Sequence, residues 1–112
     1  MSRTKFLPFV AAAVMLLGIS TIWADDTIPD ITLQNGRFEP AQLVVPANTA
    51  FKVRVTNADK AAIEWESFEL HRERVVQPGE TITVYIPALA PGTYKFFDDF
   101  HHDTVSGAIV AQ

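Results

Sequence analysis

Apolar and polar side chains alternate along much of this chain with a period of two residues. From Phe51 to Thr56 the side chains are alternately apolar and polar, and the same alternation runs from Thr81 to Ile86. Successive side chains of a β-strand point to opposite faces of a sheet, so this period is typical of strands with one buried face. Both segments are therefore predicted to be strands that line a core.

Turn residues divide the rest of the chain into further short segments. Asn35-Gly36, Pro78-Gly79 and Pro91-Gly92 are dipeptides typical of turns. Between such turns, the other segments that we expect to form strands contain Ile31 to Leu33, Phe38 to Val45, Trp65 to Leu70, Tyr94 to Phe97, and Gly107 to Val110.

The segment from Asp59 to Glu69 contains few helix breakers but has only 11 residues. We expect most of it to be a loop, with one helical turn as the alternative. In total, about seven strands follow one another at roughly 8–12-residue spacing, separated by Pro/Gly turns, which is typical of two packed sheets. The sequence therefore predicts an all-β fold, a β-sandwich.

Residues 1–24 have the three parts of a secretory signal peptide. Arg3 and Lys5 form a basic start, a mostly apolar run follows from Phe6 to Ile22, and Ala24 offers a small residue for cleavage. This run of 17 residues reaches the lower limit for spanning a membrane, so a retained anchor is the alternative. We expect cleavage, because the run contains a proline and a glycine and an acidic, turn-rich stretch follows it.

The remaining residues, 25–112, are enough for one domain, which we expect to be periplasmic and no longer attached to the membrane. The leader carries two of the nine basic residues and none of the thirteen acidic ones, so the formal charge of this domain is −6. No cluster of basic residues remains that could bind a phosphate backbone, and we expect no nucleic-acid partner. An acidic surface instead attracts cations weakly and keeps a protein soluble.

Sulfur is missing from the predicted domain. The chain has no Cys, and both Met residues, Met1 and Met15, lie in the leader. The domain must therefore be stabilised by its apolar core without disulfides. Any metal site in it must be built from oxygen and imidazole nitrogen.

Carboxylates and imidazoles gather in two segments, Glu64 to His71 and Asp98 to Thr104, which together contain all three His residues. Asp98 and His101 are three residues apart in a tight turn between strands, so we expect them to converge on one ion. Such ligands suit hard or borderline divalent cations. The alternative is that these loop side chains are only solvated, although nearby phenylalanines could exclude water from them.

Other kinds of site find little support. The serines lack the surroundings of a hydrolase nucleophile, and the five glycines are isolated turn residues, unlike a phosphate-binding loop.

Several motifs resemble the cupredoxin family. The segment from Pro91 to His101 is similar to the family pattern Pro-Gly-x-Tyr-x-Phe-x-Cys-x-x-His, and Val76 to Gly79 is similar to its Val-x-Pro-Gly turn. Asn57 to Asp59 resembles its Asn-x-Asp loop, and Glu66 to Phe68 stands where the family has His-Asn-Phe. The resemblance covers essentially the whole domain and implies a cupredoxin-like Greek-key β-sandwich.

The resemblance also implies where metal ligands would lie. Glu66 stands for the first His ligand, Asp98 for the Cys, and His101 for the second His. The axial Met position falls at Thr104 or Val105. Without a thiolate no blue-copper electron-transfer site can form, so that part of the family function is not expected here.

This variant pattern resembles the small periplasmic cupredoxin-like components of bacterial ferrous-iron uptake systems. That resemblance implies that the protein binds Fe(II), assists its oxidation as a ferroxidase-type accessory, and delivers iron to an inner-membrane iron permease, together with a second periplasmic metal-binding protein. The candidate metal ligands are Asp98, His101, Glu66, Glu69, His71 and His102. Of these, we expect Glu69, His71 and His102, with Asp103, either to surround and support the ligands or to form a second, weak site.

Two other functions remain open. Cu(II) binds most nitrogen and oxygen sites more tightly than Fe(II), so a periplasmic Cu(II)-binding protein is one alternative. The other is a metal-free interaction module that keeps the cupredoxin fold and docks a partner through its loops.

Overall fold

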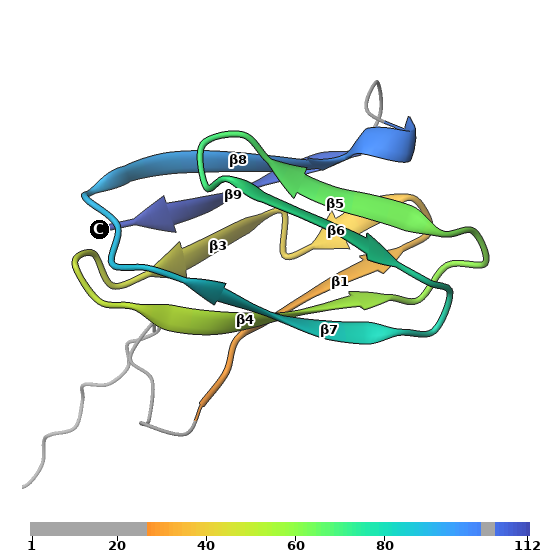
Figure 1. Ribbon diagram of the computed structural model, residues 1–112, viewed down its shortest axis with the longest axis horizontal. Helices are drawn as coiled ribbons and strands as arrows, with labels where there is room; N and C mark the ends of the chain where they lie inside the picture. Colours follow the sequence, from red (N-terminus) through yellow and green to blue (C-terminus); the bar gives the residue numbers. More distant parts are fainter. Residues whose placement is uncertain (1–26, 102–104) are drawn as a thin grey trace, which may run out of the picture.

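Two β-sheets, packed face to face, make up the part of the computed structural model that is described, residues 27–101 and 105–112 (Figure 1). The first sheet has the order β2-β1-β4-β7 and consists of β1 (Asp30–Gln34), β2 (Arg37–Glu39), β4 (Phe51–Asn57) and β7 (Thr81–Ile86). The second has the order β3-β9-β8-β5-β6 and consists of β3 (Gln42–Val45), β9 (Ser106–Ala111), β8 (Gly92–Asp98), β5 (Ile63–Ser67) and β6 (Arg72–Val76). A short 3₁₀ turn, η3 (Asp99–His101), follows β8.

The predicted all-β sandwich is confirmed, with nine strands in the described residues where about seven were expected. Each sheet contains one parallel pair of strands, β1 with β4 and β3 with β9, and its other neighbouring strands are antiparallel. The β6 strand was not predicted, because it lies at the edge of its sheet. Only Val76 of this strand is fully buried, so its sequence shows no clear alternation.

The strand expected from Trp65 to Leu70 is confirmed in part, since β5 covers Ile63–Ser67. The other expectation, that Asp59 to Glu69 is mostly loop with or without a helical turn, is wrong for its central part. Ile63, Trp65 and Ser67 are buried and the two glutamates between them are half-buried, which is the pattern of a strand. Five residues are too few for a sequence to distinguish this pattern from irregular structure, and pairing with both β6 and β8 stabilises the strand.

The predicted leader, residues 1–24, lies outside the described residues. Among the residues that are described, no helix is long and apolar enough to cross a membrane.

The core lies between the two sheets and is centred on aromatic rings. Phe96 of β8 contacts Phe38 edge-on at 5.0 Å between ring centroids and Trp65 at 5.4 Å. A β-carbon at Gly107 would lie 2.5 Å from the Phe96 ring and 2.8 Å from the backbone oxygen of Ala41. Glycine is therefore required at this position for the Phe96 ring to pack against β9.

Hydrogen bonds between side chains and backbone organise the loops at the end of the sandwich where β5 begins. The Asn57 side chain is fully buried; its Nδ2 donates to the backbone oxygens of Ala61 and Val76, at 2.8 and 3.0 Å. The Asp59 carboxylate accepts the backbone N–H groups of Asn35 and Gly36, at 2.7 and 2.9 Å. These bonds join the β4–β5 loop to β6 and to the β1–β2 turn, which positions the start of β5.

The substitution Gly107→Ala should destabilise the fold by about 1–3 kcal/mol, because the added methyl group overpacks the core against the Phe96 ring. Unfolding in urea, followed by tryptophan fluorescence, would measure this change. Ser106→Ala, at the exposed neighbouring position on β9, is the matched control and should stay within about 0.5 kcal/mol of the wild type. Equal stability of the two variants would contradict the packing argument.

Candidate functional site

Asp98, at the end of β8, has a fully buried carboxyl group with three hydrogen bonds. Its Oδ1 accepts the backbone N–H groups of Glu64 and Phe100, each at 3.0 Å. Its Oδ2 lies 2.7 Å from Nδ1 of His101. The buried position follows from the two-residue period of β8, which points both Phe96 and Asp98 into the interior.

The structure brings Asp98 and His101 together, as the spacing predicted. The two groups differ in environment, since the side chain of Asp98 is 1% exposed and that of His101 is 51% exposed. The prediction that they ligate a metal ion stays a prediction.

A cavity of about 240 Å³ lies beside this pair. Its lining residues are Leu33, Gly36, Asp59, Ala61, Ile63, Asp98, His101 and Val105. The β5 residue that reaches it is Ile63, which has no ligand atom in its side chain. The carboxylate of Asp59 is already occupied by the backbone of the β1–β2 turn.

The expected convergence of Glu66 with Asp98 and His101 is wrong. In the antiparallel pairing of β5 with β8, Trp65 lies opposite Asp98 and Glu66 lies opposite Phe97. Directly opposed residues share a face of the sheet, so Trp65 and Asp98 face the core while Glu66 faces outward. A shift of one residue along a strand moves a side chain to the other face, and motif spacing does not reveal such a shift.

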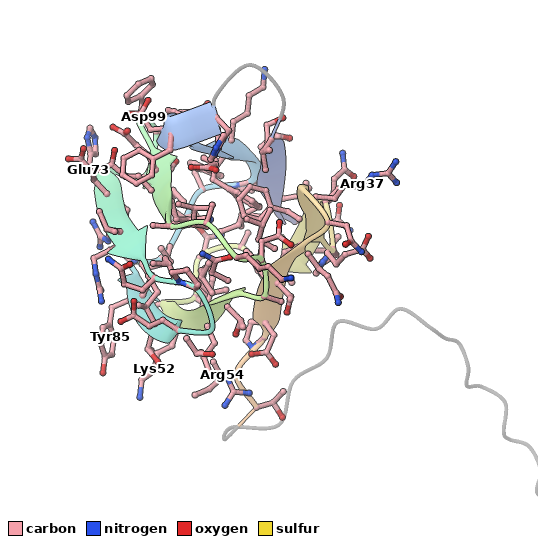
Figure 2. The ribbon with its side chains drawn as sticks, turned by 90° about the vertical axis from the view of Figure 1, so that its right-hand side faces the viewer. Arg37, Lys52, Arg54, Glu73, Tyr85 and Asp99 are labelled. Carbon is pink, nitrogen blue, oxygen red and sulfur yellow. The ribbon has the colours of Figure 1, made fainter. Side chains whose placement is uncertain are left out.

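Glu66 instead belongs to a group of carboxylates on the outer face of the five-stranded sheet. Glu64, Glu66 and Asp99 each place a carboxylate oxygen within 4.8 Å of the others. We call these three residues the outer carboxylate cluster. Glu73 of β6 lies directly opposite Glu66, and Figure 2 shows it on the same side of the molecule as Asp99.

Two carboxyl groups of this cluster, those of Glu64 and Glu66, hold their protons more tightly than usual. The pKa of Glu64 is raised to about 7, first by loss of hydration and then by hydrogen bonding and repulsion from Glu73 and Asp99. The pKa of Glu66 is also raised, first by loss of hydration and then by repulsion from the same two carboxylates. A bound cation would relieve this repulsion, so the cluster has the electrostatics of a cation site.

The other predicted ligands lie elsewhere. Glu69 and His71 belong to the turn between β5 and β6, which Figure 1 shows at the end of β5 away from η3. The Oε1 atom of Glu69 accepts the backbone N–H of Lys95 at 2.6 Å, and His71 is an exposed turn residue with a φ of 55°. Neither belongs to the outer carboxylate cluster. His102 and Asp103 lie outside the described residues.

Sequence reasoning did not select Glu64 or Asp99 as candidate ligands. One signal was available, because Glu64 and Glu66 are two residues apart and side chains at that spacing on a strand share a face. The contribution of Asp99 required the pairing register of β5 with β8, which only the structure provides.

A curated relative and several solved structures are similar to this chain. The uncharacterized protein RP394 of Rickettsia prowazekii (strain Madrid E) is 41% identical over 80 residues, which cover 71% of this chain and 64% of that protein. The chain thus spans less than two thirds of that relative's length.

The similar structures are cupredoxins. Auracyanin of Roseiflexus castenholzii has a TM-score of 0.65 at 17% identity, with 85% of this chain and 99% of that one covered. Auracyanin A of Chloroflexus aurantiacus, a "blue" copper protein, has a TM-score of 0.64 at 16% identity, with 77% and 98% covered. A purple cupredoxin of Nitrosopumilus maritimus has a TM-score of 0.60 at 18% identity, with 75% and 99% covered.

At such identities these structures establish the fold and say nothing about the ligands of this chain. The family model described as the cupredoxin-like domain matches residues 7–111, which is most of the sequence. The protein therefore belongs to the cupredoxin-like domain family.

Proposed function

We propose that this protein is a periplasmic metal-binding protein that holds iron at the outer carboxylate cluster and delivers it to an inner-membrane iron permease. The observation that carries the proposal is the proximity of three carboxylate oxygens, from Glu64, Glu66 and Asp99, within 4.8 Å of one another. Carboxylate oxygens are ligands for hard cations, and three on one surface leave positions for water or for a partner's ligand.

A blue-copper centre does not fit this chain. Such a centre requires a thiolate, and the chain has no Cys. The position that the resemblance assigned to Cys is occupied by Asp98, and both of its oxygens are engaged in hydrogen bonds. The donor atoms that remain favour a hard cation over Cu(I).

The resemblance to ferrous-iron uptake components is the source of three parts of this proposal: iron as the cargo, the permease as the partner, and a second periplasmic metal-binding protein. The donor set agrees with this cargo. Carboxylates stabilise Fe(III) more than Fe(II), because the electrostatic attraction grows with the charge of the ion. Iron bound at the cluster would therefore lose an electron to an external acceptor more readily than iron in water does.

Binding should depend on the three carboxylates of the cluster. In anaerobic titrations of the purified protein, we expect Fe(II) and Mn(II) to bind at about 1:1. Glu64→Gln, Glu66→Gln and Asp99→Asn should each weaken binding at least about tenfold, or ~1.4 kcal/mol. Glu69→Gln is the matched control, because it removes a carboxylate charge outside the cluster; it should bind like the wild type.

The same titrations separate the alternative functions. If the protein binds Cu(II) but neither Fe(II) nor Mn(II), and this binding depends on the cluster residues, copper takes the place of iron as the ion of the proposed function. A protein that binds none of the three ions would be the metal-free interaction module. Weakening by Glu69→Gln equal to that of the cluster variants would show that only overall charge matters.

The affinity for Mn(II) should fall as the pH falls through about 7. Glu64 has a pKa of about 7 in the folded protein and must lose its proton to bind the ion. One competing proton of this kind should lower the affinity about tenfold between pH 8 and pH 6. Isothermal titration calorimetry at both pH values would measure it, and Glu64→Gln should show a flatter dependence. Equal wild-type affinities at pH 8 and pH 6 would contradict the role of Glu64.

A further inference from the structure

Asp98 occupies a place in the hydrogen-bond network that the proposed function alone does not explain. Its carboxyl group is fully buried on the core side of the sheet, whereas the outer carboxylate cluster lies on the other side. Burying a carboxyl group is costly unless it is hydrogen-bonded. The identity of its partners therefore indicates what it does.

Two of those partners belong to the backbone that carries the cluster. One N–H is that of Glu64 itself, and the other is that of Phe100, the residue directly after Asp99. Both donate to the same oxygen, Oδ1, at 3.0 Å. A single atom thus holds the start of β5 and the first turn of η3.

This oxygen takes the place of a missing strand hydrogen bond. The pairing of β5 with β8 consists of Trp65 with Asp98 and Glu66 with Phe97, and it ends there. One step further the ladder would place Glu64 opposite Asp99, but the backbone turns into η3 at that point. The Asp98 side chain accepts the Glu64 N–H instead. The carboxylate oxygens of Glu64 and Asp99 remain within 4.8 Å of each other.

The third partner fixes the far end of η3. Nδ1 of His101 lies 2.7 Å from Oδ2 of Asp98. The three residues of η3 therefore wind around one carboxyl group, an arrangement in which an Asp side chain stabilises the turn that follows it.

We propose that Asp98 is a positioning residue of the outer carboxylate cluster: from the opposite face of the sheet, it holds Glu64 and Asp99 in place without contacting the ion. This inference rests on the proposed function. It assigns Asp98 a role different from that of the metal ligand which the sequence predicted.

Two substitutions separate positioning from ligation. Asp98→Asn removes the charge but keeps an oxygen acceptor in the same place, so Mn(II) affinity should stay within about threefold of the wild type. Asp98→Glu keeps the charge but displaces the oxygens by one methylene, and Asp98→Ala removes them. Both should weaken Mn(II) binding at least about tenfold. A ligand role predicts the reverse order, with Asp98→Glu retaining affinity and Asp98→Asn losing it.

Hydrogen exchange provides a readout that does not depend on metal. The amides of Glu64 and Phe100 should be protected in the wild type and in Asp98→Asn, and should exchange at least about tenfold faster in Asp98→Glu and Asp98→Ala. Amides in the centre of β4, which lies in the other sheet, serve as the control for global unfolding. If these control amides also lose protection in Asp98→Ala, that variant is globally destabilised. The positioning role is then tested by comparing the exchange rates of the Glu64 and Phe100 amides in Asp98→Asn and Asp98→Glu.

The possible failures can be told apart. Wild-type protein that binds neither Fe(II) nor Mn(II) would overturn the proposed function, and with it the role of Asp98. Wild-type binding that is undiminished in Asp98→Ala and Asp98→Glu would overturn only the positioning role. Loss of affinity in Asp98→Asn, with the Glu64 and Phe100 amides still protected, would overturn positioning in favour of a direct electrostatic role.

Discussion

The two-residue period of the strands is the constraint on which the arrangement of this site depends. It points Asp98 into the interior at the end of β8 and turns Glu64 and Glu66 of β5 to the outside. The acidic residues of one short region are thus divided between two faces of the same sheet. Asp98 lies inside and accepts hydrogen bonds, because burial without partners would be costly, whereas the carboxylates outside remain available to a cation.

The hydrogen bonds of Asp98 link these two faces. In a cupredoxin-like chain without sulfur, the residue at the position that the resemblance assigns to Cys accepts two backbone N–H groups and contacts His101. The cavity beside it is lined mainly by apolar or already hydrogen-bonded groups. The fold of the family is therefore retained, while the side chains best suited to an ion gather on the outer surface of the sheet.

The outer carboxylate cluster is an unfavourable arrangement for the folded protein alone. Loss of hydration, and after it repulsion from Glu73 and Asp99, raises the pKa of Glu64 and Glu66. Each raised pKa makes the folded state less stable as the pH rises through it, because the crowded groups must then ionise. Acidic groups with raised pKa values occur at functional sites more often than elsewhere, which supports a role for the cluster beyond solubility.

The sequence by itself determined the all-β fold and brought Asp98 and His101 together, because strand periodicity and a three-residue spacing are local properties. It did not determine which side chains face each other across strands. The register that places Glu66 opposite Phe97, the unpredicted strand β6 with Glu73, and the approach of Asp99 to Glu64 all depend on contacts between distant segments. A shift of one residue reverses a side chain's face, so only the tertiary structure decided that Glu66 lies with Glu64 and Asp99 and away from Asp98.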